Sequence, residues 1–298
     1  MSSVALSLTF AVLAQFLSAL IVLIDKHIVT KTAVSNPVVY TFYVGLLSGA
    51  VLPIASLGIV HAPDSYTIIL SVLMGVSFIF SIIFLYSALK IAATTDIVPW
   101  LVAISTVATF LLGSFFLMEN LPQTFVPALL FFVMSMFFVG HFRFNMKSFF
   151  FIACSGILFA LSGVLLKILF SHTSFIDGFF WSRMGNVFAA SLLFLLPSCR
   201  QGVLKSTKNM TQSAGFLIVL NRVLGGLAFL LVVYAINLGS VSMVNALSSL
   251  QFLFVFVLIF LMRKIMPAQF EHEFRPGHVA HKILSMFFIL VGFFVLFL

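Results

Sequence analysis

The sequence predicts an all-α integral membrane protein with ten transmembrane helices. Hydrophobic residues make up 62% of the 298 residues, charged residues only 7%, and the mean hydropathy is +1.26. Soluble domains carry about a quarter charged residues, so this chain lacks the side chains to cover a surface in water. A helix needs roughly 20 mostly apolar residues to cross a bilayer. Ten segments come close to that length: 3–24, 38–60, 66–90, 94–118, 123–140, 148–170, 178–197, 213–236, 240–262 and 281–298.

The polar segments between these apolar stretches are short. The longest, Arg200–Gln212 and Arg263–Lys282, have the length of loops. The chain therefore has no room for a soluble catalytic or nucleic-acid-binding domain, and we expect neither enzymatic activity nor a nucleic-acid partner. The net charge of +8 instead favours contact with anionic lipid headgroups, because the basic residues fall between the apolar segments.

Nothing in the sequence indicates a cofactor or a metal site. Walker A, HExxH and CxxC patterns do not occur. Cys154 and Cys199 lie within or at the end of apolar segments, which indicates free thiols. The histidines of the segment QFEHEFRPGHVAHK are expected in a solvated loop, so we predict no metal ligands and no cofactor.

Lys and Arg also predict the orientation. They gather in the loops after the odd-numbered segments, with Lys31, Arg143, Arg200 and Arg263 among them, whereas the loops after the even-numbered segments carry almost none. Cytoplasmic loops of membrane proteins are rich in these residues. Both termini are therefore expected outside the cell.

The two halves of the sequence resemble each other. Lys26 aligns with Lys167, a separation of 141 residues (167 − 26), and Tyr86 in LYSALKIA aligns with Tyr234 in VYAINLGS. Each half holds five apolar segments, and an odd number makes the second copy enter the membrane from the opposite side. Many transporters are built this way. We predict two inverted five-helix repeats, over residues 1–144 and 145–298.

Three segments carry a resemblance to a known family: FLYSALKIA, FFLMENLPQ and VYAINLGSVSMVNALSSLQF. With them the chain resembles the ten-helix, EamA-like branch of the drug/metabolite transporter superfamily over nearly its whole length. Met118-Glu119-Asn120-Leu121 stands where the family has G-E-R/K-L, without its Gly and Arg. The resemblance implies a permease in the cytoplasmic (inner) membrane of a bacterium. Family members usually place both termini in the cytoplasm, which disagrees with the charge pattern.

Polar residues inside the apolar segments are the candidates for substrate binding. A charged side chain in hydrocarbon costs about 2.5–3.5 kcal/mol on insertion scales, so such groups are expected to face the protein interior or water. The candidates are Lys26, Tyr86, Lys167, Trp181, Arg183, Asn221, Arg222, Tyr234 and Asn245.

The aligned residues suggest a matched pair of sites. Lys26 and Lys167 would place cations at the two mouths of a central cavity, although both could instead extend to lipid headgroups and Asp25 could neutralise Lys26. Tyr86 and Tyr234 would line the cavity from equivalent positions, or belong to an interfacial aromatic belt.

The remaining candidates lie mostly in the second half. Trp181 and Arg183 suit a cation–aromatic lining for an amphipathic solute, with interface anchoring as the alternative for Trp181. Arg222 could grip a carboxylate or reach a lipid phosphate. Asn221 and Asn245 could line the cavity or hydrogen-bond between helices.

Two glutamines, Gln251 and Gln15, lead to further expectations. Asn245 and Gln251 lie six residues apart, about 240° on an ideal helix, so they would face one cavity only if the helix were irregular. Gln15 stands where four-helix multidrug-resistance relatives have a proton-exchanging glutamate. We therefore expect no proton-coupled export of cationic drugs.

These features predict a secondary transporter that moves a small polar or amphipathic metabolite by alternating access. The alternative is a lipid or lipid-linked sugar flippase, which a lateral opening lined with apolar residues would favour. A membrane-bound transferase would need clustered His, Asp or Glu near one face, which the sequence lacks outside the loop before Lys282. The expected partners are a small-molecule substrate and membrane lipid, in a monomer or a homodimer.

Overall fold

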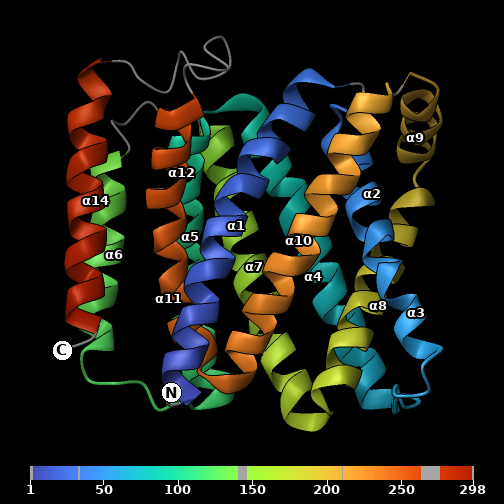
Figure 1. The fold of residues 1–298 in the computed structure, drawn as a ribbon, viewed down its shortest axis with the longest axis horizontal. Helices are drawn as coiled ribbons and strands as arrows, with labels where there is room; N and C mark the ends of the chain where they lie inside the picture. The colour runs from blue at the N-terminus through green and yellow to red at the C-terminus, as the bar shows by residue number, and fades with distance from the viewer. Residues whose placement is uncertain (1–2, 33, 140–145, 210, 263–275, 297–298) are drawn as a thin grey trace.

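The computed structural model describes residues 3–32, 34–139, 146–209, 211–262 and 276–296. Every regular element in this part of the chain is helical (Figure 1). The helices are α1 (Ser3–Lys31), α2 (Pro37–Leu47), α3 (Leu52–Ala55), α4 (Ser65–Ile91), α5 (Thr94–Leu112), α6 (Phe125–Val139), α7 (Met146–His172), α8 (Phe175–Phe194), α9 (Pro197–Asn209), α10 (Gln212–Leu238), α11 (Val241–Ala246), α12 (Leu250–Met262) and α14 (Pro276–Leu296).

Irregular turns extend three of these helices. A 3₁₀ turn, Ser48–Val51, joins α2 to α3, and another, Leu247–Ser249, joins α11 to α12. A π-helical turn, Gly113–Leu117, follows α5 and ends at Met118, which has a left-handed backbone with φ 46°. The apolar segments at these places are therefore continuous helices with a local change of pitch.

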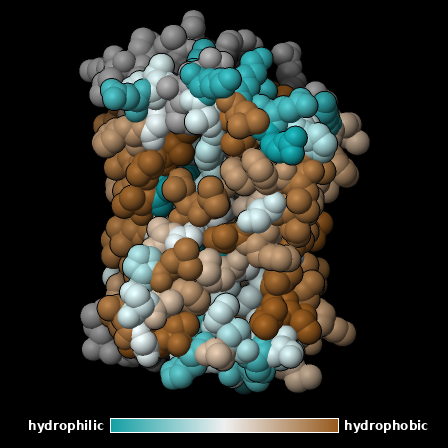
Figure 2. All heavy atoms as spheres, turned by 90° about the vertical axis from the view of Figure 1, so that its right-hand side faces the viewer, coloured by the Kyte–Doolittle hydropathy of each residue, from teal (hydrophilic) through white to brown (hydrophobic). Residues whose placement is uncertain are grey.

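The apolar character of the helices agrees with an all-α membrane protein. Seven helical segments in the described part of the chain are long and apolar enough to cross a membrane, and α8 with α9 makes an eighth if that bent pair is one span. Shorter apolar stretches lie in α6 and α14. Hydrophobic residues cover the middle of the face shown in Figure 2, and hydrophilic residues gather at both of its ends.

One expected loop is a helix. The segment Arg200–Gln212 was predicted as a polar loop, but α9 covers most of it and bends by 97° from α8. Its pattern is amphipathic: Cys199 and Ser206 are buried, whereas Lys205 and Lys208 are exposed. Proline at the first helical position is favourable there because its missing N–H has no partner in the first turn anyway.

Helices from the two halves of the chain pack against each other in the centre. The helix α1 packs along α10, α4 packs along α7 and α8, and α5 also contacts α7. At one edge of the molecule α6 pairs with α14, and at the other α2 packs on α8 (Figure 1). The central helices therefore form two sides of an interior space, with α1 and α10 on one side and α4 and α7 on the other.

Two glycines make a close crossing between α4 and α8. A Cβ on Gly185 of α8 would overlap the Ser71 carbonyl oxygen of α4, and one on Gly75 would overlap the Gly185 backbone. Glycines in the apolar segments, Gly225 and Gly226 among them, predict close helix approach. That prediction is wrong for Gly225 and Gly226, because a Cβ at either position would meet no described atom within 4 Å.

The glycine crossing should be sensitive to a single methyl group. Gly185→Ala is expected to destabilise the protein by about 1–3 kcal/mol or more, because the atoms in the way are backbone and a shift would separate α4 from α8. Gly225→Ala is the control and should change stability by no more than about 1 kcal/mol. Thermal unfolding in detergent measures both, and similar melting temperatures would contradict the close crossing.

The charge pattern predicts which end of the molecule faces the cytoplasm. Lys208 is exposed on α9, and Ala62 is exposed at the opposite end, before α4. With Cys154 and Cys199 replaced by Ala, a cysteine at position 208 should react with an impermeant thiol reagent only from the cytoplasmic side. A cysteine at position 62 should react only from outside. The reverse pattern in intact cells would overturn the orientation and leave the fold unchanged.

Candidate functional site

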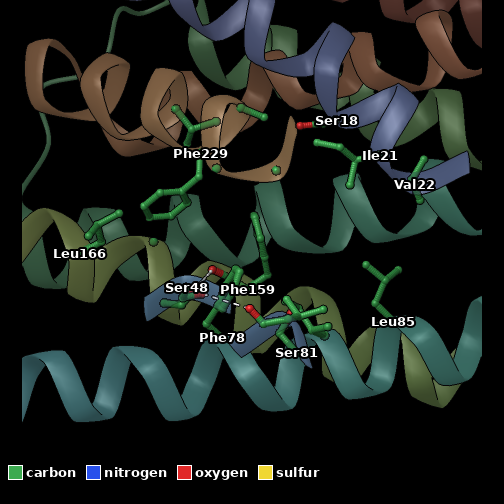
Figure 3. Close-up of a pocket in the computed structure, with 18 of the residues that line it drawn as sticks. Ser18, Ile21, Val22, Ser48, Phe78, Ser81, Leu85, Phe159, Leu166 and Phe229 are labelled. Carbon is green, nitrogen blue, oxygen red and sulfur yellow. Dashed lines mark hydrogen bonds between the residues drawn. The ribbon is translucent and has the colours of Figure 1, made fainter. Parts of the chain in front are cut away.

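A cavity of about 500 Å³ lies between the central helices. Figure 3 shows Ser18 of α1 and Phe229 of α10 on one side, facing Phe78 and Ser81 of α4 on the other. Residues of α2, α5, α7, α8, α11 and α12 complete the lining, while α6 and α14 contribute nothing to it. Both halves of the chain therefore build one shared cavity.

A buried ion pair lines the upper end of this cavity, near the C-terminal ends of α1 and α4, which lie at the top of Figure 1. The Asp25 Oδ1 atom lies 2.6 Å from Arg222 Nη2 and accepts further hydrogen bonds of 2.6 Å from the Tyr40 hydroxyl and the Asn221 amide. The Tyr40 ring stacks on Tyr86, with centroids 4.6 Å apart. These five residues, from α1, α2, α4 and α10, fill the interior between the two halves.

The sequence does not determine which basic residue pairs with Asp25, and the structure shows it. Asp25 was considered as a neighbour that could neutralise Lys26, but it binds Arg222 instead. The reason is geometric, because side chains of adjacent helical residues diverge by about 100°. Arg222 and Tyr86 both line the cavity as expected. The Arg222 charge is already paired, and Asn221 lies behind the lining in the same cluster.

A second buried arginine lies in the cavity without an ionic partner among the described residues. Arg183 of α8 lines the cavity, is 8% exposed, and its guanidinium carbon lies 3.2 Å from the centroid of the Phe229 ring. Its Nε and Nη2 atoms have no hydrogen-bond acceptor in the described part of the chain. The expected cation–aromatic contact therefore exists, but with Phe229 in place of Trp181.

Trp181 points elsewhere because it lies two residues from Arg183, about 200° around the helix. Its indole Nε1 donates to the His61 carbonyl, 3.2 Å away, at the lower end of the molecule. Tyr234 also lies outside the lining and packs edge-on against Phe10 and Phe175. These two aromatic residues hold helices and loops together.

The two aligned lysines bind helix ends and do not line the cavity. The Lys26 ammonium donates to the carbonyls of Leu89 and Ala92, the second at 2.7 Å, at the C-terminal end of α4. The Lys167 ammonium donates to the Ile236 and Gly239 carbonyls at 2.6 and 2.8 Å, at the end of α10. Carbonyls at a helix C-terminus lack intrahelical donors, so each lysine satisfies such groups and opposes the helix dipole.

Asn245 and Gln251 both line the cavity, because the helix between them is irregular. The 3₁₀ turn Leu247–Ser249 changes the angular spacing that an ideal α-helix would give them. Asn245 donates to the Ser105 carbonyl at 3.2 Å and to the Thr109 hydroxyl, and Gln251 donates to the Ser18 carbonyl at 3.2 Å. Both amides thus join helices as well as facing the cavity.

The cavity also has a lateral opening between α2 and α10. We use this name for the exposed lining residues Leu47 of α2, Ala50 of the 3₁₀ turn that follows it, and Val223 and Gly226 of α10. The helix α2 packs on α4, α8 and α9, and α10 packs on α1. The helices α2 and α10 meet through Tyr40, whose hydroxyl accepts hydrogen bonds from Asn221 and Arg222. The side chains at the opening are apolar.

At the lower end, two His–Asp pairs join the halves. His61 Nδ1 lies 3.0 Å from Asp177, and His172 Nε2 lies 3.0 Å from Asp64. Hydrogen bonds from Thr67 and from His172 lower the pKa of the Asp64 carboxyl to about 2. Asp64 also caps α4, through the Thr67 amide.

Sequence reasoning missed the residues whose role depends on a distant partner. Phe78 and Phe229 are two of 39 phenylalanines, and no local pattern distinguishes them. Tyr40 carries a signal, because it aligns with Trp181 in the second half, but its contact with Asp25 appears only in the fold.

The ion pair of Asp25 and Arg222 should contribute strongly to stability. Asp25→Asn leaves a buried guanidinium without a counter-charge, and breaking a buried pair in this way typically costs about 3–5 kcal/mol. The double variant Asp25→Asn/Arg222→Gln should recover part of the loss. Unfolding of the purified protein measures both, with Lys208→Gln, which removes an exposed charge on α9, as the control. Equal, small effects of all three variants would show that the pair adds nothing.

No family model and no curated protein matches this chain. Its fold is similar to that of a protein of known crystal structure, with a TM-score of 0.64 and 17% identity. The similarity covers 99% of this chain and 97% of the other. At this level of identity the likeness establishes a shared fold over almost the whole length of both chains.

Proposed function

We propose that this protein is a secondary transporter, an EamA-like permease of the drug/metabolite transporter superfamily, which moves a small polar or amphipathic metabolite by alternating access. The observation that carries the proposal is the shared cavity. Phe78 lies in the middle of α4 and Gly225 in the middle of α10, so the cavity is centred near the middle of the helices. Secondary transporters bind their substrates near the bilayer midplane, between two repeats.

We further propose ten transmembrane helices in two inverted repeats, α1–α6 and α7–α14. Two pairs of positions support this reading. The helices α4 and α10 start 147 residues apart (212 − 65) and end 147 apart (238 − 91). Lys26 binds carbonyls 89 and 92, and Lys167 binds carbonyls 236 and 239, again 147 residues further on. The two lysines bind at opposite ends of the molecule, as inversion requires.

Contacts between the proposed repeats occur at both ends of the cavity. Asp25 and Arg222 join them at the upper end, and His61–Asp177 and His172–Asp64 join them at the lower end. Alternating access would break one set of contacts while the other holds. The proposal places the protein in the cytoplasmic membrane of a bacterium, with a small-molecule substrate and membrane lipid as its partners.

A lipid or lipid-linked sugar flippase is the second candidate, and one observation favours it. The lateral opening is lined by apolar, exposed residues and connects the cavity with the region where lipid chains would lie. A flippase needs such a path, since the lipid tail stays in hydrocarbon while the headgroup crosses. Both candidates use the same cavity and differ in whether the substrate remains attached to the bilayer.

The cavity should be the binding site for the transported compound. Ser18→Phe places a large side chain in the cavity, whereas Leu13→Phe on the same helix faces outward from a position that is 50% exposed. Metabolite pools screened by thermal shift should contain fractions that stabilise the wild type and Leu13→Phe. A ligand at 100 times its Kd adds about 2.7 kcal/mol. The same fractions should leave Ser18→Phe unchanged.

The stabilising fraction should then enter proteoliposomes that contain the wild type, and not those that contain Ser18→Phe. Uptake that survives the substitution would contradict a central transport site. Stabilisation without uptake, but with scrambling of a labelled lipid, would favour the flippase.

A further inference from the structure

The charge inside the cavity identifies a substrate class, on the premise of the transport function proposed above. Arg222 is neutralised by Asp25 at 2.6 Å, and the two lysines at the helix ends bind carbonyls outside the lining. Arg183 has neither a salt-bridge partner nor any acceptor for its Nε and Nη2 atoms within the described residues. The cavity therefore contains one uncompensated positive charge.

A buried guanidinium in this state is costly unless something pairs with it. Arg stays protonated in proteins, so it cannot escape the cost by losing its proton. Stacking on Phe229 at 3.2 Å and the more distant Phe78 at 5.9 Å offsets part of the cost. A ring face offers no acceptor in the plane of the N–H groups, so the Nε and Nη2 donors, which are themselves buried, stay unsatisfied in this state.

The same arginine lies next to the lateral opening. Phe229, on which it stacks, is three residues, or about one helical turn, from Gly226 at the edge of the opening. A Cβ on Gly226 would meet no described atom within 4 Å, and neighbouring Val223 is 64% exposed. An anion at Arg183 would thus have an apolar path beside it that leads to the lipid chains.

We propose that the substrate is an amphipathic anion, whose anionic group binds the guanidinium of Arg183 while its hydrocarbon tail passes through the lateral opening between α2 and α10. Phe229 and Phe78 hold the guanidinium in place, and Leu47, Val223 and Gly226 contact the tail. The arrangement selects against cationic amphipaths, because the charge in the cavity would repel them.

Decanoate tests this assignment in the full-length protein reconstituted in nanodiscs. The measured quantity is the ligand-induced shift in melting temperature and the Kd fitted from it. Decanoate should bind the wild type more tightly than octanoate, with affinity rising by up to about fourfold per methylene. Acetate, decanol and decyltrimethylammonium should bind at least tenfold more weakly than decanoate. Equal binding of decanol or of the cation would overturn the assignment.

Substitution of the arginine tests the anionic end. Arg183→Gln should weaken decanoate binding about tenfold or more, since charge-assisted hydrogen bonds are lost. Arg183→Lys should recover only part of it, because lysine cannot present the planar fork. Arg200→Gln, on exposed α9, removes the same charge and should leave the Kd unchanged. A Kd that is the same in Arg183→Gln and the wild type would overturn the proposal.

Substitution at the opening tests the tail. Gly226 has room for a Cβ, so Gly226→Phe should place its ring across the path and weaken decanoate binding by about tenfold or more. Leu227→Phe lies at the same depth on the outward-facing side and is the control. Unchanged decanoate binding in Gly226→Phe would refute the proposed path.

These experiments distinguish a failure of the amphipathic-anion proposal from a failure of the proposed transport function. If decanoate fails to bind while a metabolite fraction still stabilises the wild type and not Ser18→Phe, the transport function stands and the amphipathic anion is wrong. If neither decanoate nor any metabolite fraction stabilises the wild type, both proposals fall.

Discussion

Hydrocarbon offers no hydrogen bonds, and most of the internal contacts of this protein follow from that constraint. A polar group between apolar helices must find its partner within the protein or face a large cost. Lys26 and Lys167 satisfy carbonyls at helix ends, and Asp25 pairs with Arg222. Ser81 and Ser155 each donate to the other's carbonyl where α4 crosses α7. These polar contacts connect helices that are far apart in the sequence.

Arg183 differs from these paired groups. It is as buried as the paired groups, yet two of its donors have no acceptor in the described part of the chain. Asp25 and Arg222 pair with each other and the two lysines bind carbonyls, whereas Arg183 has no counter-charge among the described residues. The position of Arg183 in the cavity lining, and not its residue type, makes it the focus of the proposed site.

Under the proposed repeat, the lateral opening has a closed counterpart. The third helix of the first half, α4, packs closely on the second helix of the second half, α8, through Gly75 and Gly185. The equivalent pair is α10 and α2, where Gly225 and Gly226 face open space. The two sides of the molecule thus differ in one helix contact. Exchange of the open and closed arrangements between the two sides would be one way for the halves to interconvert.

Sequence reasoning reached the helical class and the approximate helix positions, because these depend on local patterns. Apolar segments and clusters of basic residues can each be recognised within a short stretch of the chain. The prediction of a loop at Arg200–Gln212 was wrong, because it was based on the average polarity of the segment and not on the amphipathic pattern of α9. Sequence reasoning also placed Gly225 and Gly226 at close crossings that they do not make, because local sequence carries no record of what lies opposite a glycine.

The sequence by itself determined the helical class, since apolar segments of roughly 20 residues satisfy their backbone internally as helices. Only the tertiary structure decided which polar residues meet. Asp25 lies one position from Lys26 but pairs with Arg222, 197 residues away. Arg183 stacks on Phe229 and not on nearby Trp181. Helix rotation and packing fix these choices, because they set the direction of each side chain relative to helices that are remote in the sequence.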